Sequence, residues 1–430
     1  MKSVYMTRIV DNILEKRLES VGAVLIAGPK WCGKTTTAEQ QAKSVLKLQD
    51  PDKTLGYLET AKVKPSLLLA GENPRLIDEW QMAPVLWDAV RHAVDMRGET
   101  GLFILTGSTT IDESSIMHSG TGRISRMVMY PMSLYESKES SGQVSLAELF
   151  QSHETDIDGA NSSLSVEQLV FSACRGGWPS SIKKKTERTM LFEAKNYVAN
   201  ICESDASTVD GIKRSPERVR AVLQSYARNI STLASDKTIF KDVTSNHMDM
   251  SEPTLHAYIS ALERLYVVED IPAWCPSIRS ATSMRAGKKK GFVDPSIAAA
   301  SLSLSPDSLL MDMKTFGFLF ECLCFRDLKI YSSALGGYVS YYRDRYGLEA
   351  DCVLHLADGR YALIEFKLGS TGIEEGASHL LELGRLIKKS YDEKKPRLRE
   401  PSFLMVLTAG EIAYRRKDGV IVVPIGCLRD

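Results

Sequence analysis

Residues 21–36 read VGAVLIAGPKWCGKTT, and this stretch decides the fold of the N-terminal part of the chain. The apolar run at residues 21–27 has the composition of a buried strand in a parallel sheet. Gly28 to Thr35 match the pattern G-x-x-x-x-G-K-[ST], and a helix is expected from about Thr35. A strand, a glycine-containing turn and a helix in this order predict a phosphate-binding P-loop, against the alternative of a chance match.

Each part of this motif has a physical reason. Glycines allow backbone N–H groups to converge on phosphate oxygens, and the start of the helix adds its positive dipole end. Lys34 is expected to reach the β and γ phosphates, and Thr35 to bind Mg²⁺ through its hydroxyl. The motif therefore predicts a site for ATP and Mg²⁺ formed by Gly28, Pro29, Lys30, Trp31, Cys32, Gly33, Lys34, Thr35 and Thr36.

Two further apolar runs follow, at residues 74–78 and 101–107, with helical stretches between the runs. Strands that alternate with helices predict an α/β sheet covered by helices on both faces. The first of these apolar runs ends in Asp78, and Glu79 follows it directly. We expect Asp78 to bind Mg²⁺, usually through water, and Glu79 to orient and deprotonate the attacking water. The alternative is a solvated strand end.

Polar residues that follow the third strand are candidates for contact with the γ-phosphate or the water. Ser108 is the first choice and Thr106 the second, and an ordinary turn rich in Ser and Thr is the alternative. Arg123 is a candidate to stabilise charge on the transferring phosphoryl group, from the same chain or from a neighbour in a homo-oligomer. A structural surface arginine is the alternative.

The rest of the chain reads as a mostly helical region followed by an α plus β region. A loop is expected over residues 137–165 and helices over 166–235. Ser251 and Pro253 mark the start of a helix, and the sequence VVEDIPAW at 267–274 reads as a strand, so a winged helix-turn-helix is expected here. The last region has a helix near 316–328 and strands at 338–342, 349–356 and 361–366.

Charged residues of this last region form a second constellation. Asp351 ends an alternating strand pattern, and Glu365 and Lys367 follow it with the spacing D-x13-E-x-K, at i and i+2 on one face of the next strand. Two carboxylates can hold a divalent metal that, with a lysine, activates water against a phosphodiester. Glu321 is a further candidate ligand and Glu349 a reserve. The alternative is a hairpin with a cross-strand ion pair.

Several stretches together resemble a family of bacterial AAA-type ATPases that carry a C-terminal domain of unknown function. They are GPKWCGKTT, RLIDEWQ, FILTGS, HSGTGRISR with YPMSLYES, GGWP at 176–179, and YYRDRYGLEADCVLHLADGRYALIEFKLG. The resemblance implies a P-loop, AAA-like ATPase domain at 1–150, a helical and winged-helix domain at 151–278, and a PD-(D/E)xK nuclease-like α+β domain, similar to restriction endonucleases, at 279–430.

Composition sets limits on location and partners. Lys plus Arg equals Asp plus Glu at 54 each, so a basic surface must be local. Without an apolar run of membrane-spanning length, the sequence predicts a cytoplasmic protein with no membrane contact. Two basic runs favour DNA as a partner, against the alternative of solvated faces: Lys183, Lys184, Lys185 and Arg188, and then Arg279, Arg285, Lys288, Lys289 and Lys290.

Two functions remain open at this point. The first is an ATPase coupled to metal-dependent cleavage or remodelling of nucleic acid, which the intact Glu79, Asp351, Glu365 and Lys367 favour. The second is a nucleotide-switched protein whose last two domains bind DNA or another protein without cutting it.

Overall fold

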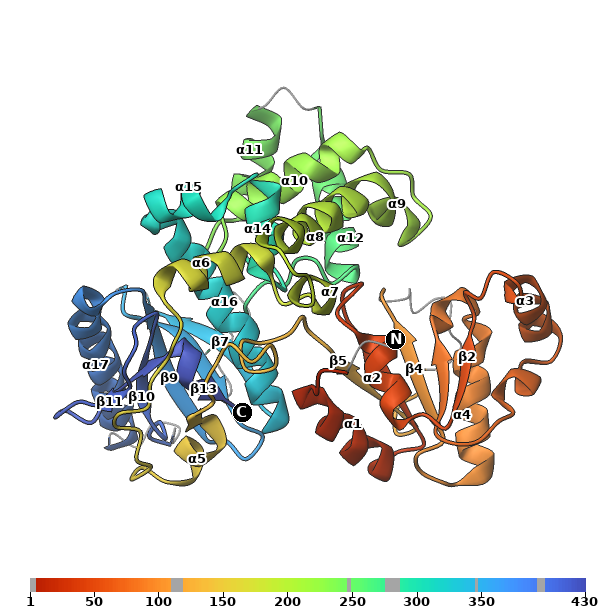
Figure 1. Ribbon diagram of the computed structural model, residues 1–430, viewed down its shortest axis with the longest axis horizontal. Coiled ribbons are helices and arrows are strands. Elements are labelled where there is room, and N and C mark those ends of the chain that lie inside the picture. The colour runs from red at the N-terminus through yellow and green to blue at the C-terminus, as the bar shows by residue number, and fades with distance from the viewer. Residues whose placement is uncertain (1–4, 110–118, 246–248, 275–286, 345–346, 393–398) are drawn as a thin grey trace. The chain divides into compact units, whose positions relative to one another are not determined.

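The computed structural model describes residues 5–109, 119–245, 249–274, 287–344, 347–392 and 399–430. The chain divides into two compact units, shown in Figure 1. The first unit contains Met1–Pro131, Asp205–Lys213 and Ser260–Val267. The second contains Met132–Ser204, Arg214–Ile259 and Val268–Asp430.

A five-stranded parallel sheet forms the centre of the first unit. The strand order is β2-β3-β4-β1-β5, with bounds Ser44–Lys47, Arg75–Asp78, Phe103–Gly107, Ala23–Ala27 and Ile124–Val128. All neighbouring pairs are parallel, so the carboxyl ends of the strands meet at one edge. The predicted parallel α/β sheet is therefore confirmed, and the P-loop follows β1 at that edge.

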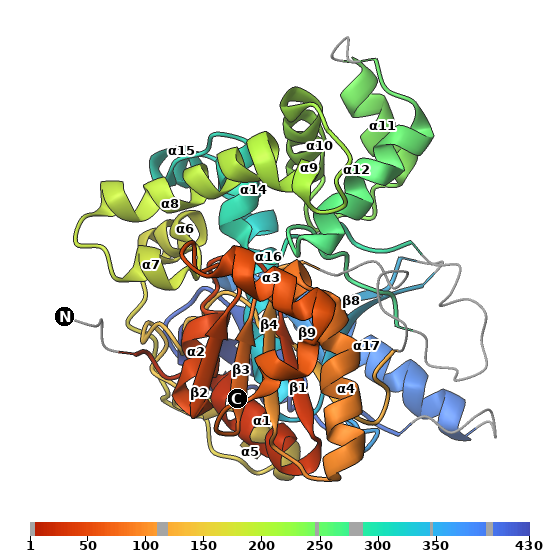
Figure 2. The ribbon, with the colours of Figure 1, turned by 90° about the vertical axis from the view of Figure 1, so that its right-hand side faces the viewer.

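Helices cover both faces of this sheet because β1 is apolar on both sides. Leu25 packs into a cluster with Leu86 and Trp87 of α4, Val85–Arg97. Ile26 packs into a second cluster with Leu14 of α1, Ile9–Ser20, and with residues of α2, Lys34–Gln41. The short helix α3 spans Thr54–Val63. Figure 2 shows α2 and α4 flanking the strands.

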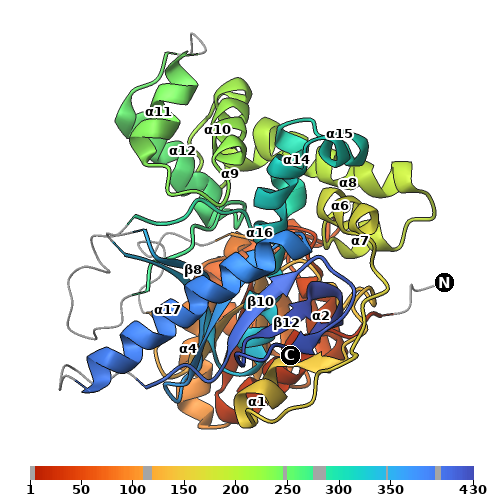
Figure 3. The ribbon, with the colours of Figure 1, turned by 90° about the vertical axis from the view of Figure 1, so that its left-hand side faces the viewer.

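A six-stranded mixed sheet forms part of the second unit, in the order β11-β12-β10-β9-β8-β7. Its strands span Tyr414–Arg415, Ile421–Pro424, Leu404–Thr408, Tyr361–Lys367, Glu349–His355 and Tyr338–Arg343. Helix α17, Ile373–Asp392, lies across it in Figure 3 and packs Leu380 and Leu383 against its core. Helix α16, Met313–Ala334, contributes Phe325, whose ring lies 5.2 Å from that of Phe366. The three strands expected in this region are present.

The helices of the second unit confirm the helical expectation for residues 166–235. Within that range they are α6 Val166–Arg175, α7 Pro179–Ile182, α8 Glu187–Asn200 and α10 Pro216–Arg228, and α11 Asp236–Ser245, α14 Pro295–Ser301 and α15 Pro306–Met311 follow later in the chain. Helix α12, Glu252–Arg264, belongs to both units. The expected cap at Ser251 is present, since its hydroxyl accepts a bond from Thr254 N at 3.3 Å.

One local expectation was wrong, and another was incomplete. VVEDIPAW makes isolated bridges, Val268–Phe292, Ile271–Lys289 and Ala273–Tyr341, instead of a continuous strand. Pro272 has no N–H to donate to a ladder, which interrupts the pairing. Residues 137–165 are also more than a loop: Ser145 caps α5, Leu146–Gln151, and β6, Val144–Ser145, pairs with β13, Leu428–Arg429.

None of the helices in the described ranges combines the length and apolar character needed to cross a bilayer. Cys322 and Cys324, two residues apart, are buried thiols on α16.

Candidate nucleotide-binding and active site

Two glycines set the backbone path of the P-loop. Gly28 has φ +146°, and a Cβ there would lie 2.2 Å from the carbonyl oxygen of Met129. Gly33, at φ +103°, is the residue from which α2 begins. Side chains rarely adopt such positive φ values, so the two motif glycines are required by the backbone itself. Trp31, between them, is a non-glycine residue at φ +65°.

Lys34 lies buried inside the loop. Its ammonium donates to the carbonyl oxygens of Gly28 at 3.0 Å and Pro29 at 2.7 Å. The side chain is thus held at the carboxyl end of β1, where the backbone N–H groups of the loop and of α2 also gather. An ammonium and helix N–H groups at one place suit the anionic oxygens of a polyphosphate.

Asp78 connects three segments at the carboxyl edge of the sheet. Its Oδ1 accepts a hydrogen bond from the hydroxyl of Thr35 at 2.7 Å and another from Thr106 at 2.6 Å. Asp78 and Thr106 are partners in neighbouring strands β3 and β4, which brings them together. The carboxylate and the Thr35 hydroxyl are hard oxygen ligands of the kind that Mg²⁺ binds, so the residues present fit the predicted metal.

Glu79 follows at once and turns the backbone away from the strand. It has φ +56°, a left-handed conformation that costs a non-glycine residue free energy and is found preferentially at functional sites. Its Oε2 accepts hydrogen bonds from the side-chain amide of Gln81 and from Ser108 Oγ, the latter at 3.5 Å. Both predicted residues, Glu79 and Ser108, therefore lie side by side at the edge that carries the P-loop.

Arg123 lies at the amino ends of the strands, opposite the end that carries the P-loop. It immediately precedes β5, and its carbonyl accepts from the N–H of Ala23, the first residue of β1, whereas the P-loop follows Ala27 at the far end. Its guanidinium is half-exposed and pairs with Asp95 at 2.6 Å. A role for Arg123 in the site of its own chain is therefore wrong, because parallel strands place the two at opposite ends. A contribution to a neighbouring chain stays a prediction.

Three residues that contact the site could not be recognised from motifs: Arg8, Asp205 and Gln81. Arg8 donates to the carbonyl oxygens of Cys32 and Tyr130 at 2.9 Å each, and so ties the P-loop to the segment after β5. Lys30 of the loop pairs with Asp205 at 2.7 Å, from a segment 175 residues away in sequence. Gln81 is the third, and its place at the end of the stretch RLIDEWQ was the only indication of it in the sequence.

The charged residues of the second constellation converge as the strand pattern predicted. Asp351 on β8 accepts the backbone N–H of Phe366 at 3.0 Å, which places it beside Glu365 on β9. Lys367 Nζ lies 3.6 Å from Glu365 Oε2. Burial, together with the nearby Asp351 carboxylate, raises the pKa of Glu365 well above its usual value.

An unexpected lysine completes this cluster. Lys289 Nζ lies 2.7 Å from Glu321 Oε1 and 3.3 Å from Asp351 Oδ1, with all three side chains largely buried. Burial alone would lower the pKa of Lys289, but the two carboxylates outweigh it and raise that pKa above its usual value. In the described ranges, no group of three or more His, Cys, Asp or Glu side chains is arranged to hold a metal ion.

The second basic run was misread as a surface. Lys289 and Lys290 are buried, and Lys290 pairs with Asp270 at 2.8 Å and Asp236 at 2.9 Å. Arg279 and Arg285 lie outside the described residues, and Lys288 is exposed. The first run is exposed: Lys183, Lys184 and Lys185 lie between α7 and α8, and Arg188 lies in the first turn of α8.

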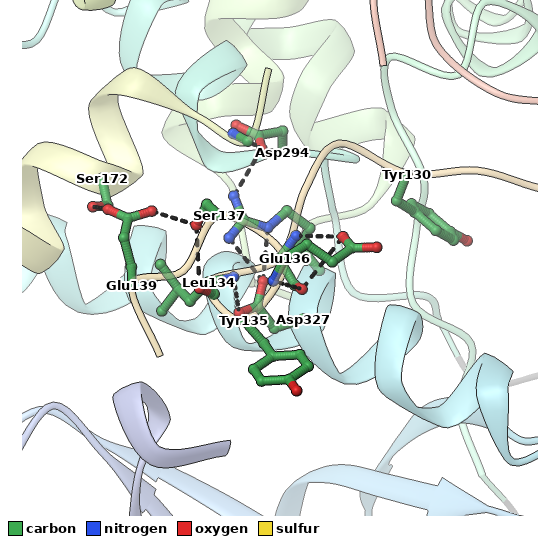
Figure 4. Close-up of polar contacts among 12 residues, drawn as sticks. Tyr130, Leu134, Tyr135, Glu136, Ser137, Glu139, Ser172, Asp294 and Asp327 are labelled. Carbon is green, nitrogen blue, oxygen red and sulfur yellow. Dashed lines mark hydrogen bonds and ion pairs between the residues drawn. The ribbon is translucent and has the colours of Figure 1, made fainter. Parts of the chain in front are cut away.

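The YPMSLYES block serves a structural purpose in the second unit, shown in Figure 4. The backbone N–H of Leu134 donates to Asp327 of α16 at 3.0 Å. Arg326, almost fully buried, pairs with Asp327 at 2.7 Å and with Asp294 at 3.0 Å. Asp294 also accepts the N–H of Gly177 in the GGWP stretch at 2.9 Å. These buried charges are mutually satisfied, which is the condition for keeping them away from water.

Comparison with known families divides the chain into three matched stretches. Residues 20–138 match the AAA domain, 166–308 match a domain of unknown function (DUF8612), and 316–428 match another domain of unknown function (DUF4143). The first stretch contains the P-loop, Asp78, Glu79 and Ser108, so an AAA-type P-loop domain is supported there. The winged-helix and nuclease-like expectations stay predictions.

Individual relatives are distant. Two uncharacterized proteins, from Mycobacterium bovis and Mycobacterium tuberculosis, are each 24% identical over 272 residues, covering 62% of this chain and 53% of theirs. The match thus spans about half the length of these relatives. Among solved structures, a Walker-type ATPase of Pyrococcus abyssi is 12% identical, with 68% of this chain and 94% of that chain covered, at a TM-score of 0.39. A DNA-bound Drosophila ORC structure is 13% identical, with 71% and 89% covered, at a TM-score of 0.20.

Proposed function

We propose that this chain is an Mg²⁺-dependent ATPase that binds ATP at the P-loop of its first unit. The observation that carries the proposal is the carboxylate of Asp78, which accepts hydrogen bonds from both Thr35 and Thr106. It joins the start of α2 to the ends of β3 and β4, next to the buried ammonium of Lys34. An AAA-type match over the same residues supports the assignment.

The residues divide the work of hydrolysis. Lys34 and the N–H groups of the loop bind the polyphosphate, with Gly28 and Gly33 allowing the backbone to approach. Thr35 and Asp78 hold Mg²⁺, which neutralises charge on the phosphates when it is bound. Glu79, with Gln81 and Ser108 at its carboxylate, takes the proton of the attacking water. Thr106 keeps Asp78 in position by donating to it.

Replacing Asp78 by Asn tests the metal assignment. The amide keeps the size of the side chain and can still accept from one threonine, but it loses the charge that attracts Mg²⁺. We expect hydrolysis to need a higher Mg²⁺ concentration, by at least about tenfold, since about 1.4 kcal/mol of lost attraction has that effect. Turnover measured across a magnesium series gives the answer. If turnover depended on the Mg²⁺ concentration as it does in the unaltered protein, Asp78 would not be a metal ligand. Asp52→Asn, an exposed change in the same unit, is the matched control.

We further propose that the second unit binds DNA, with α12 and its neighbours acting as the winged-helix region. The support is the exposed cluster of Lys183, Lys184, Lys185 and Arg188 from the end of α7 into the first turn of α8. Cations on a surface bind phosphates without regard to sequence, and they release counterions when they do so. This fits the second of the two functions above, in which nucleotide binding governs a binding module.

The triple variant Lys183→Ala, Lys184→Ala, Lys185→Ala tests this proposal. We expect weaker retention of double-stranded DNA and a shallower dependence on salt, by roughly 0.9 in slope for each lost phosphate contact. Arg385→Ala, Lys388→Ala, Lys389→Ala removes the same charge from an exposed stretch of α17 and serves as the control. Equal loss in both variants would show only a general effect of charge.

A further inference from the structure

The ammonium of Lys289 lies where the carboxylates of the second unit converge. It is 2.7 Å from Glu321 Oε1 on α16 and 3.3 Å from Asp351 Oδ1 on β8. These are two of the residues expected to ligate a divalent metal. The ring of Tyr341 lies 5.7 Å from the same ammonium, a distance at which an aromatic face attracts a cation.

Other groups of the protein also face the remaining carboxylate oxygens of Asp351 and Glu365. Asp351 Oδ2 accepts the backbone N–H of Phe366 at 3.0 Å. Glu365 Oε2 faces Lys367 at 3.6 Å, and its Oε1 is buried without a hydrogen-bond partner among the described residues. The residues present do not fit a divalent ion in this arrangement.

We propose that Lys289 is the resident cation of this cluster and takes the place of a divalent metal, so that the second unit carries out no metal-dependent cleavage. Its ammonium supplies the positive charge that Glu321 and Asp351 need in a buried setting. The lysine is a covalent part of the chain, so its charge is present at the cluster at every concentration of free ions. The inference concerns the second unit and does not depend on ATP hydrolysis in the first.

The backbone holds Lys289 in this position from both sides. Lys289 N and O pair with Ile271 O and N at 3.0 and 2.8 Å. The next residue, Lys290, is fixed to Asp270 at 2.8 Å, with its ammonium 4.9 Å from the ring of Tyr226 on α10. Consecutive lysines thus insert into two different acidic clusters, and neither ammonium is available as a loose surface charge.

Manganese binding to the nucleotide-free full chain tests the proposal. Lys289→Met keeps the length of the side chain and removes its charge. We expect this variant to bind one additional Mn²⁺ per chain, at least about tenfold tighter than any binding at this site in the unaltered protein, measured by electron paramagnetic resonance. The additional ion should disappear in Lys289→Met, Asp351→Asn. Lys288→Met, at the exposed neighbouring position, should behave like the unaltered protein.

Three outcomes would overturn the proposal. One is a Mn²⁺ site in the unaltered protein that Asp351→Asn abolishes, and another is DNA cleavage by the unaltered protein that Glu365→Ala abolishes. The third is a folded Lys289→Met variant that gains no ion. If removing the charge prevents folding, Lys289→Gln replaces it as a neutral hydrogen-bonding variant. If that also fails to fold, identical Mn²⁺ titrations of the unaltered and Asp351→Asn proteins support the resident lysine, and different ones refute it.

Discussion

Lys34→Ala is expected to abolish ATP hydrolysis and to weaken ATP binding strongly. The substitution removes the ammonium that we expect to face the β and γ phosphates, and it leaves the carbonyl oxygens of Gly28 and Pro29 without their donor. Losing one preorganised donor at a reacting centre costs about 10²–10³ in rate, and this donor is charged as well. Turnover and calorimetric titration with ATP and Mg²⁺ measure both effects.

Thermal unfolding gives an independent measure for the same variant. A ligand that binds only the folded state adds about 2.7 kcal/mol of stability at one hundred times its dissociation constant. We expect ATP to raise the melting temperature of the unaltered protein and to have little effect on Lys34→Ala. Lys43→Ala, exposed just after α2, is the matched control and should respond like the unaltered protein. Normal affinity and turnover in folded Lys34→Ala would refute the site.

The P-loop and its carboxylates could be predicted because their geometry is local or follows from strand direction. Gly28 to Thr35 are consecutive, and the strand that ends in Asp78 is parallel to the one that ends in Gly107. Parallel strands bring their carboxyl ends together whatever the loops between them do. The same rule, applied to Arg123, shows that a residue before a strand lies at the wrong edge.

Lys289 could not be predicted in the same way. Its partners Glu321 and Asp351 are 32 and 62 residues away in the sequence, and only the folded second unit brings them together. A run of consecutive lysines reads as a solvated surface, since lysine is almost never fully buried without a partner. Acidic partners exist here, but no residue close to the run in the sequence indicates them. Lys30 and Asp205 are another pair of this kind.

Glu79→Gln is expected to separate binding from catalysis. The amide has the size of the carboxylate, and its oxygen can still accept from Gln81 and Ser108, but it cannot take a proton from water. We expect ATP affinity close to normal and turnover lower by about 10²–10⁴, the usual contribution of a general base. A single-turnover measurement with radiolabelled ATP tests the chemical step directly.

The comparison with Lys34→Ala makes this result specific. Lys34→Ala loses binding and turnover together, whereas Glu79→Gln should retain bound, unhydrolysed ATP, because only the proton acceptor has changed. Glu72→Gln, exposed before β3 and therefore at the opposite ends of the strands from the site, controls for the loss of one negative charge in the same unit. Normal turnover in Glu79→Gln would mean that another group positions the water. The left-handed backbone of Glu79 and its hydrogen bonds would then serve the turn after β3 and not the reaction.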